Sequence, residues 1–271
     1  MRLRERVVIV VNLLDERSEI HLLDFVLVIY VLYSSYRVRD PPYCLCVRYK
    51  ETNISANHQR GAKAAGTVLL RQYLQTTNIW RYSNGLTAQI GYFGQTAVLN
   101  DCLYKNMYKS KFVLLNDIDE IILPTIDWDW SSMMENLQKQ FPNITVFHFE
   151  NHIFPTSVKS SGFDLWSHVS GVNILHHNFR EPINWKVFND RKMVVNPREV
   201  FQTSIHTALK HRGKRKNIGQ DVAITFHCTH KRRNNITTKD LILDDSLRRY
   251  NLTLVPNVDR VIRRLFPFMY V

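Results

Sequence analysis

The stretch KFVLLNDIDEIILP, residues 111–124, joins two apolar runs through a group of carboxylates. The runs FVLL and IIL have the length and composition of short buried β-strands. Between them lie the three carboxylates of Asp117, Asp119 and Glu120, and a proline ends the second run. This pattern predicts two buried strands that meet at an acidic turn.

The sequence on both sides of this stretch alternates between helical and strand patterns. Apolar residues at helical spacing predict a helix over residues 96–108, and the same spacing occurs over residues 68–74. Farther along, the predicted elements are a helix over 128–140 that begins near Asp127 or Asp129, a strand over 145–149, a strand that contains Val194 and Val195, and helices over 240–250 and 255–265. This alternation predicts an α/β fold.

The chain has 271 residues, 45% of them hydrophobic, and a formal net charge of +12. Such a composition is that of a globular protein with a substantial core. The basic balance favours anionic partners: nucleic acid, an acidic membrane or phosphorylated small molecules. The densest basic runs, residues 211–216 and 230–233, have no aromatic platform or nucleic-acid-binding motif beside them. We therefore interpret these runs as solvated loops and predict no nucleic-acid partner.

The cysteines and the glycosylation sequons bear on the compartment. Cys44, Cys46, Cys102 and Cys228 do not have the spacing of a zinc site, but they allow disulfides in an oxidising compartment. The sequence Asn-x-Ser/Thr occurs at Asn53, Asn143, Asn235 and Asn251. Together these features favour a protein of the secretory pathway.

The N-terminal apolar stretches are shorter than a membrane span. Residues 7–14 and 22–33 each fall below the roughly 20 residues that a spanning helix needs. Charged residues lie between them, and Asp24 interrupts the second stretch. Their Val, Ile and Tyr content fits buried strands, so we expect no spanning segment in this chain.

The acidic turn has a chemical interpretation. Three carboxylates within four residues repel one another, and burying them is costly unless a cation compensates their charge. Mg²⁺ and Mn²⁺ prefer such hard oxygen ligands and complete their coordination with water and substrate phosphate. The pattern therefore indicates a divalent-metal site for a phosphate-containing substrate.

Two metal-dependent enzyme classes use such a turn. In glycosyltransferases the metal holds the diphosphate of a nucleotide sugar and neutralises the departing nucleoside diphosphate. In phosphatases of the haloacid dehalogenase type the first aspartate is the nucleophile, and residues 239–245 resemble the later acidic motif of that class. Ile121 stands where those phosphatases have Thr or Val, and the motif begins after more than a hundred residues. These departures favour the glycosyltransferase.

A wider set of residues resembles glycosyltransferase family 92. The resemblance rests on GYFGQTAVLNDCLY at 91–104, SKFV at 110–113 and DIDEIILP at 117–124. Three later blocks agree with it: FHFENHIFP at 147–155, KMVVNPREVFQTSIH at 192–206, and the segments LRRY at 247–250 and PNVD at 256–259. The resemblance covers roughly residues 60 to 265.

The resemblance implies a fold and an activity. The expected fold is GT-A-like, a mixed central sheet flanked by helices. The expected activity is metal-dependent, inverting transfer of galactose from UDP-galactose to a glycan or glycoprotein acceptor, such as a fucose-containing N-glycan, with Mn²⁺ or Mg²⁺. Family members are typically Golgi membrane proteins with a lumenal catalytic domain. A catalytically impaired glycosyltransferase-like protein is the alternative.

The resemblance also implies roles for individual residues. Asp117 and Asp119 would bind the metal and the donor, and Glu120 would orient them. His206 is the candidate for a further metal or diphosphate ligand, and His227 competes with it for this role. Three residues of the 91–104 block complete the expected donor site: Gln95, Asn100 and Asp101.

The general base stays open between three carboxylates, Glu181, Asp164 and Asp190. Glu181 is slightly favoured because Arg180 and Pro182 suggest an ordered turn.

The resemblance also predicts a division of the chain. Residues 61–271 would be the catalytic domain, and residues 1–60 an irregular and incomplete N-terminal part. Residues 22–26 and 47–55 resemble pieces of the first two strands, without the helix and glycine turn expected between them. We therefore expect a whole metal site beside an incomplete nucleotide pocket.

Overall fold

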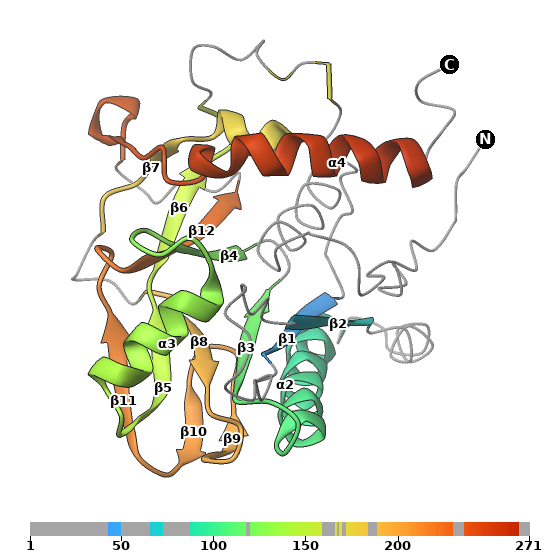
Figure 1. Ribbon diagram of the computed structural model, residues 1–271, viewed down its shortest axis with the longest axis vertical. Coiled ribbons are helices and arrows are strands. Elements are labelled where there is room, and N and C mark those ends of the chain that lie inside the picture. The colour runs from blue at the N-terminus through green and yellow to red at the C-terminus, as the bar shows by residue number, and fades with distance from the viewer. Residues whose placement is uncertain are drawn as a thin grey trace, which may run out of the picture.

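The computed structural model describes residues 43–49, 66–72, 87–117, 120–158, 166, 168–169, 172–183, 189–229 and 236–265. In these ranges the protein is a mixed α/β structure with several sheets and few helices (Figure 1). The general prediction of an α/β fold is thereby confirmed. The predicted positions Asp119 and Asp164 lie outside the described residues.

The largest sheet has six strands in the order β11-β5-β8-β3-β1-β2. They are β1 (Tyr43–Tyr49), β2 (Gly66–Gln72), β3 (Phe112–Asp117), β5 (Ile144–Phe149), β8 (Lys192–Val195) and β11 (Lys214–Ile218). β11 runs parallel to β5, whereas the other neighbouring strands are antiparallel. The central sheet is therefore mixed.

The α-helices of the described part are α2 (Thr87–Asn106), α3 (Trp130–Gln140) and α4 (Asn251–Leu265). α2 contains most of the helix predicted over 96–108 but begins earlier. Asp129 is the N-cap of α3, where its carboxylate accepts a hydrogen bond of 2.8 Å from the backbone N–H of Ser132. The cap settles which of the two predicted aspartates begins this helix.

Both faces of β3 are covered, which explains its unbroken apolar run. Successive side chains of a strand point to opposite faces of the sheet. Val113 and Leu115 accordingly share a buried cluster with Leu99 and Leu103 of α2. Phe112 and Leu114 pack instead with the buried side chains of α3. The strand that leads to the acidic turn is thus held from both sides.

A second sheet has three strands in the order β4-β12-β6. They are β4 (Glu120–Pro124), β6 (Asn151–Pro155) and β12 (Ala223–Thr229). β12 is antiparallel to β4 and parallel to β6. β3 and β4 therefore belong to different sheets, although only residues 118–119 separate them.

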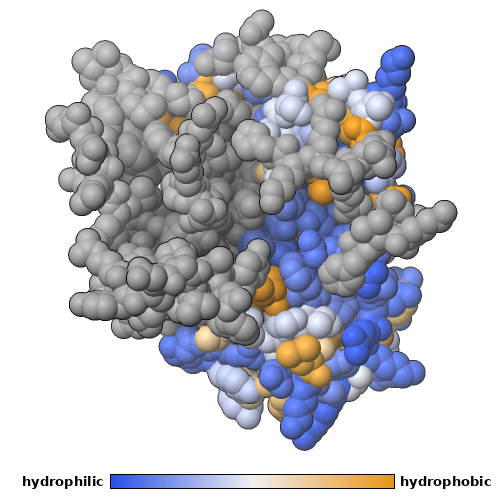
Figure 2. Space-filling view, turned by 180° about the vertical axis from the view of Figure 1, so that it is seen from behind, coloured by the Kyte–Doolittle hydropathy of each residue, from blue (hydrophilic) through white to orange (hydrophobic). Residues whose placement is uncertain are grey.

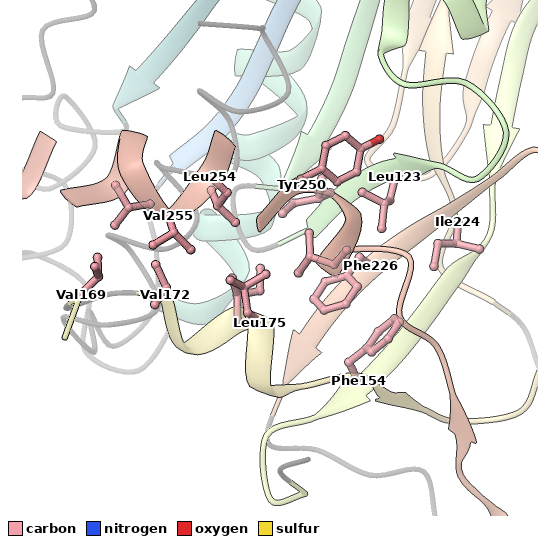
Figure 3. Close-up of a cluster of buried hydrophobic side chains, with 14 of the residues drawn as sticks. Leu123, Phe154, Val169, Val172, Leu175, Ile224, Phe226, Tyr250, Leu254 and Val255 are labelled. Carbon is pink, nitrogen blue, oxygen red and sulfur yellow. The ribbon is translucent and has the colours of Figure 1, made fainter. Parts of the chain in front are cut away.

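The second sheet is covered by α4 and by the 3-10 helix η4 (Val172–His176) (Figure 3). Phe154 and Phe226 stack there with ring centroids 3.8 Å apart. Leu254 and Val258 are fully buried on the side of α4 that contacts this cluster. Burial of this apolar face, rather than helix propensity, accounts for the position of α4.

The other elements are short. They are the pair β9 (Val200–Thr203) and β10 (Ala208–His211), the pair β7 (Phe179–Arg180) and β13 (Ile242–Leu243), and the 3-10 helices η5 (Thr238–Asp240) and η6 (Arg248–Tyr250).

The helix predicted over residues 240–250 is wrong, since η5, β13 and η6 occupy this region. Asp240 completes a capping box with Thr237 and so closes a single turn. β13 pairs with β7 in place of the helix, and Asp244, directly after β13, bonds to Arg180 of β7 at 2.8 Å. Long-range contacts override the local pattern here.

The helical spacing over residues 68–74 was also misleading, because β2 covers most of it. β2 pairs with β1 along its whole length, with Val68 opposite Val47. β1 overlaps the strand predicted within residues 47–55 and lies inside the six-stranded sheet. The strand predicted at residues 22–26 falls outside the described residues.

The described part of the surface in Figure 2 is mostly hydrophilic, with scattered apolar residues. In keeping with this, Tyr108, Trp128 and Leu252 are single exposed side chains from separate parts of the chain. None of the helices that the structure describes is long and apolar enough to cross a membrane.

Candidate functional site

The acidic turn places two carboxylates of unlike exposure at the junction of the two sheets. Asp117 ends β3, and its side chain is 28% exposed. Glu120 begins β4, and its side chain is only 4% exposed. The backbone carbonyl of Glu120 accepts a hydrogen bond from the side-chain amide of Asn116, so the end of β3 is tied to the start of β4.

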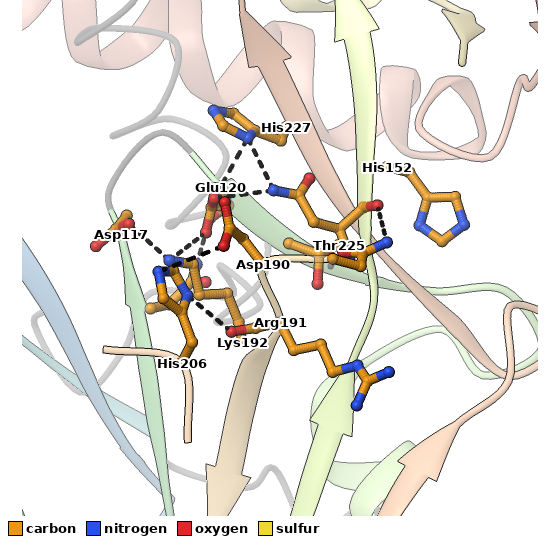
Figure 4. Close-up of polar contacts among 12 residues, drawn as sticks. Asp117, Glu120, His152, Asp190, Arg191, Lys192, His206, Thr225 and His227 are labelled. Carbon is orange, nitrogen blue, oxygen red and sulfur yellow. Dashed lines mark hydrogen bonds and ion pairs between the residues drawn. The ribbon is translucent and has the colours of Figure 1, made fainter. Parts of the chain in front are cut away.

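Lys192, the first residue of β8, lies between these carboxylates with its side chain 1% exposed. Its Nζ donates to Oδ2 of Asp117 at 2.6 Å and lies 3.0 Å from Oε2 of Glu120. A buried ammonium is tolerated only when such partners compensate its charge. Lys192 and Glu120 thus form a buried ion pair, and Asp117 extends it toward solvent (Figure 4).

The other oxygen of Glu120 faces two side chains from the second sheet. Oε1 lies 3.3 Å from Nδ2 of Asn151, which donates to it, and 3.3 Å from Nδ1 of His227. His227 stands opposite Glu120 in the antiparallel register of β12 and β4. Nδ2 of Asn151 also lies 3.0 Å from Nδ1 of His227, which closes a triangle of contacts (Figure 4).

The side chain of Asn189 holds Asn151 in place by bonding to the backbone of Asn151. Its Oδ1 accepts from the backbone N–H of Asn151 at 2.9 Å, and its Nδ2 donates to the carbonyl of the same residue at 3.1 Å. Sequence reasoning missed Asn189 and Lys192 as site residues and left Asn151 unassigned. The available signal was the presence of polar residues beside apolar strand runs at 147–155 and 192–195.

His206 lies near the same lysine on the exposed side of the site (Figure 4). Its Nδ1 is 3.2 Å from the carbonyl oxygen of Arg191, and its Nε2 is 3.8 Å from Oδ1 of Asp190. Burial, together with the charge of Lys192, lowers the pKa of His206 below its usual value. The imidazole is therefore kept in the neutral form that binds metals. The structure brings this predicted residue into the region of Asp117.

The three base candidates have different positions. The side chain of Asp190 is 59% exposed and lies beside His206. Glu181 is buried, and its backbone N–H bonds to the carbonyl of Ile153 at 2.9 Å, on the side of β6 away from β12. Asp164, the third candidate, lies outside the described residues.

The predicted donor residues on α2 have structural contacts. Asn100 donates to the carbonyl of Thr203 at 2.8 Å and accepts from the N–H of the same residue at 3.0 Å, which ties α2 to β9. Asp101 forms a 2.8 Å ion pair with Lys105 on the helix surface. Gln95 lies in α2, and for this residue the structure describes the backbone alone.

The carboxylates that resembled a phosphatase motif form contacts with the β7 region. Asp244 forms a 2.8 Å ion pair with Arg180, and both side chains are mostly buried. Asp245 accepts from the side-chain amide of Asn178 at 2.7 Å. These contacts explain both residues as anchors of the segment that leads to η6.

The donor set of the acidic turn agrees with a hard divalent cation, as far as the structure describes it. Asp117 offers a partly exposed carboxylate, and the neutral imidazole of His206 lies nearby. No group of three or more His, Cys, Asp or Glu side chains suited to a metal occurs among the described residues, which do not include Asp119.

Comparison with known proteins adds independent findings. A galactan beta-1,4-galactosyltransferase of Arabidopsis thaliana is 25% identical to the chain over 142 residues. This match covers 50% of the chain but only 26% of the plant protein, so the chain spans about a quarter of that relative. The model of glycosyltransferase family 92 matches residues 64–261, which hold the acidic turn, Lys192, His206 and His227. The chain therefore belongs to glycosyltransferase family 92.

Proposed function

We propose that this protein is a metal-dependent, inverting galactosyltransferase that uses UDP-galactose and extends a glycan chain. Its fold would be a variant of the GT-A type, with the acidic turn at the end of a central strand of a mixed sheet. The observation that carries the proposal is the partly exposed carboxylate of Asp117 at the end of a buried strand, beside His206.

The proposed metal site consists of Asp117, Asp119 and His206. A bound Mn²⁺ or Mg²⁺ would supply the charge that neutralises the departing diphosphate. Before transfer, Asp117 would orient the donor through its partly exposed carboxylate, which Lys192 holds in place.

Inversion needs a base that removes the proton of the acceptor hydroxyl. Among the described candidates Asp190 suits this role better than Glu181, since its carboxylate is exposed next to His206 whereas Glu181 is buried beyond β6. Asp190 would accept the proton as the acceptor oxygen attacks the anomeric carbon.

The relative and the family resemblance support a glycan acceptor. The plant relative acts, by its name, on galactan with β-1,4 specificity. A β-1,4-linked galacto-oligosaccharide and a fucose-containing N-glycan are thus the two acceptors to compare. A lumenal, oxidising location agrees with the disulfide formed by Cys102 and with the exposed sequon at Asn143.

The test is a calorimetric titration of the protein with UDP, with and without Mn²⁺. We expect binding that depends on Mn²⁺ and that falls at least about tenfold in Asp117→Asn, which corresponds to about 1.4 kcal/mol. Asp259→Asn is the matched control, because Asp259 forms a surface ion pair with Arg263 on α4. Equal affinity for UDP in Asp117→Asn and the control would contradict the proposal.

Transfer itself is measured with UDP-galactose and each of the two acceptors. A galactosylated product identifies an active enzyme and its acceptor. Mn²⁺-dependent UDP binding without transfer to either acceptor, or hydrolysis of the donor, would instead identify the catalytically impaired alternative.

A further inference from the structure

Among the described residues at the acidic turn, Lys192 is the most deeply buried charge. Its side chain is 1% exposed, and its Nζ contacts Asp117 at 2.6 Å and Glu120 at 3.0 Å. Asp117 belongs to the six-stranded sheet and Glu120 to the three-stranded sheet, so a single ammonium bridges both.

The carboxylates of Asp117 and Glu120 differ in their exposure to solvent. Glu120 is 4% exposed, and its two oxygens face Lys192 on one side and Asn151 and His227 on the other. Asp117 is 28% exposed and is bonded to Lys192 through Oδ2. Asp117 is therefore the carboxylate that a cation from solvent reaches first, whereas Glu120 is engaged within the protein.

We propose that Lys192 is a positioning residue, a permanent internal counter-cation that neutralises Glu120 and holds the carboxylates of Asp117 and Glu120 together at the junction of the two sheets. The metal part of this inference rests on the proposed function. Glu120 then serves to hold Lys192 and does not bind the metal.

The physical reason lies in the charge balance. Without Lys192, the carboxylates of Asp117 and Glu120 would repel each other at the sheet junction, and Glu120 would remain as a buried charge without a cation. A divalent cation in the site would replace part of the missing positive charge. Removal of Lys192 should therefore make folding stability depend more strongly on Mn²⁺.

The experiment measures thermal unfolding of the whole chain in EDTA and in Mn²⁺. In EDTA we expect Lys192→Met to lower the Tm by about 10 °C, because removal of one partner of a buried pair is strongly destabilising. The double variant Lys192→Met/Glu120→Gln should recover at least half of this loss. Mn²⁺ should raise the Tm of Lys192→Met more than that of the wild type.

Lys210→Met is the control, since Lys210 is exposed on β10, and it should leave both the Tm and its Mn²⁺ shift unchanged. A purely packing role for Lys192 predicts no recovery in the double variant, and this outcome, or a double variant that does not fold, overturns the inference. Recovery without any Mn²⁺ shift in wild type or variants supports the counter-cation but contradicts the proposed metal site, so the two failures are distinguishable.

Discussion

The two ends of β5 treat positive charge in opposite ways. At its C-terminal end, Phe149 stands opposite Lys192, which is buried and contacts two carboxylates. At its N-terminal end, Ile144 stands opposite Lys214 of β11, in a basic segment defined here as residues 210–215. Ile144 and Phe149 are five residues apart along β5, which corresponds to about 17 Å of strand.

The basic segment has no carboxylate partner within the part of the chain that the structure describes. Lys210, Arg212, Lys214 and Arg215 are exposed and form no salt bridge there. Arg212 lies instead over the ring of Phe201, at 5.3 Å from its centroid. Water compensates these charges, while Lys192 depends on protein partners. The contrast shows that burial, rather than the number of charges, decides where this protein needs an ion pair.

The largest expected effect concerns two buried histidines, His148 within β5 and His152 in β6. Burial, and then the charge of Arg191, lowers the pKa of His148 to about 4, and burial, and then the charge of Arg180, lowers the pKa of His152 to about 4. Since the unfolded chain takes up these protons near pH 6.5, stability falls as the pH drops from about 6.5 toward 4. Between about pH 7.5 and pH 5 we expect a loss on the order of 2 kcal/mol for each histidine, measured by urea unfolding.

Variants of these histidines sharpen the test. His148→Gln and His152→Gln should each flatten the acid-side slope of the unfolding free energy. Arg215→Gln should do so slightly, because the charge of Arg215 helps to lower the pKa of His148. An unchanged slope in both histidine variants would mean that other groups cause the acid sensitivity.

A second, smaller effect is expected from Asn151→Ala. Asn151 is 5% exposed and donates to Glu120 in the buried network. Its loss should lower the free energy of unfolding by about 1–3 kcal/mol, the cost of leaving buried polar groups without a partner. Asn136→Ala is the control, because Asn136 donates to Asp127 at 2.9 Å on the surface. Equal losses in chemical denaturation would remove the distinction between buried and exposed hydrogen bonds.

The smallest effect should follow neutralisation of the basic segment. We expect Lys214→Gln and Arg215→Gln to change the unfolding free energy at neutral pH by less than about 0.5 kcal/mol each, because both side chains are solvated. Denaturant titration at low and high salt measures this. A loss above about 1 kcal/mol would show that the segment contributes to the fold through contacts other than ion pairs.

The sequence predicted the local elements around the acidic turn well. β3, β4, α3 and β5 lie close to their predicted positions, because each has a clear apolar period and α3 has the Asp129 cap. The predictions failed over residues 68–74 and 240–250, where strand pairing with β1 and with β7 decides the structure. Such pairing depends on residues far away in the chain, which a local period does not include.

The site was predicted less completely for the same reason. Asp117 and Glu120 were selected as candidates because they are neighbours in sequence, and His206 was selected from the family resemblance. Lys192 lies 75 residues from Asp117, and nothing in its local sequence identifies its partner. The roles of Asn151 and Asn189 likewise appear only in the folded chain, where Asn151 connects β6 to Glu120 of β4 and Asn189 connects the segment before β8 to β6.

The crossing of the chain from β3 to β4 has one more consequence. The acidic turn is the covalent link between two sheets, and Lys192 and Asn116 form non-covalent links at the same place. Neither sheet contains the site by itself: the six-stranded sheet holds Asp117 and Lys192, and the three-stranded sheet holds Glu120 and His227. The site is thus a property of the docked pair, and its geometry exists only when both sheets are assembled against each other.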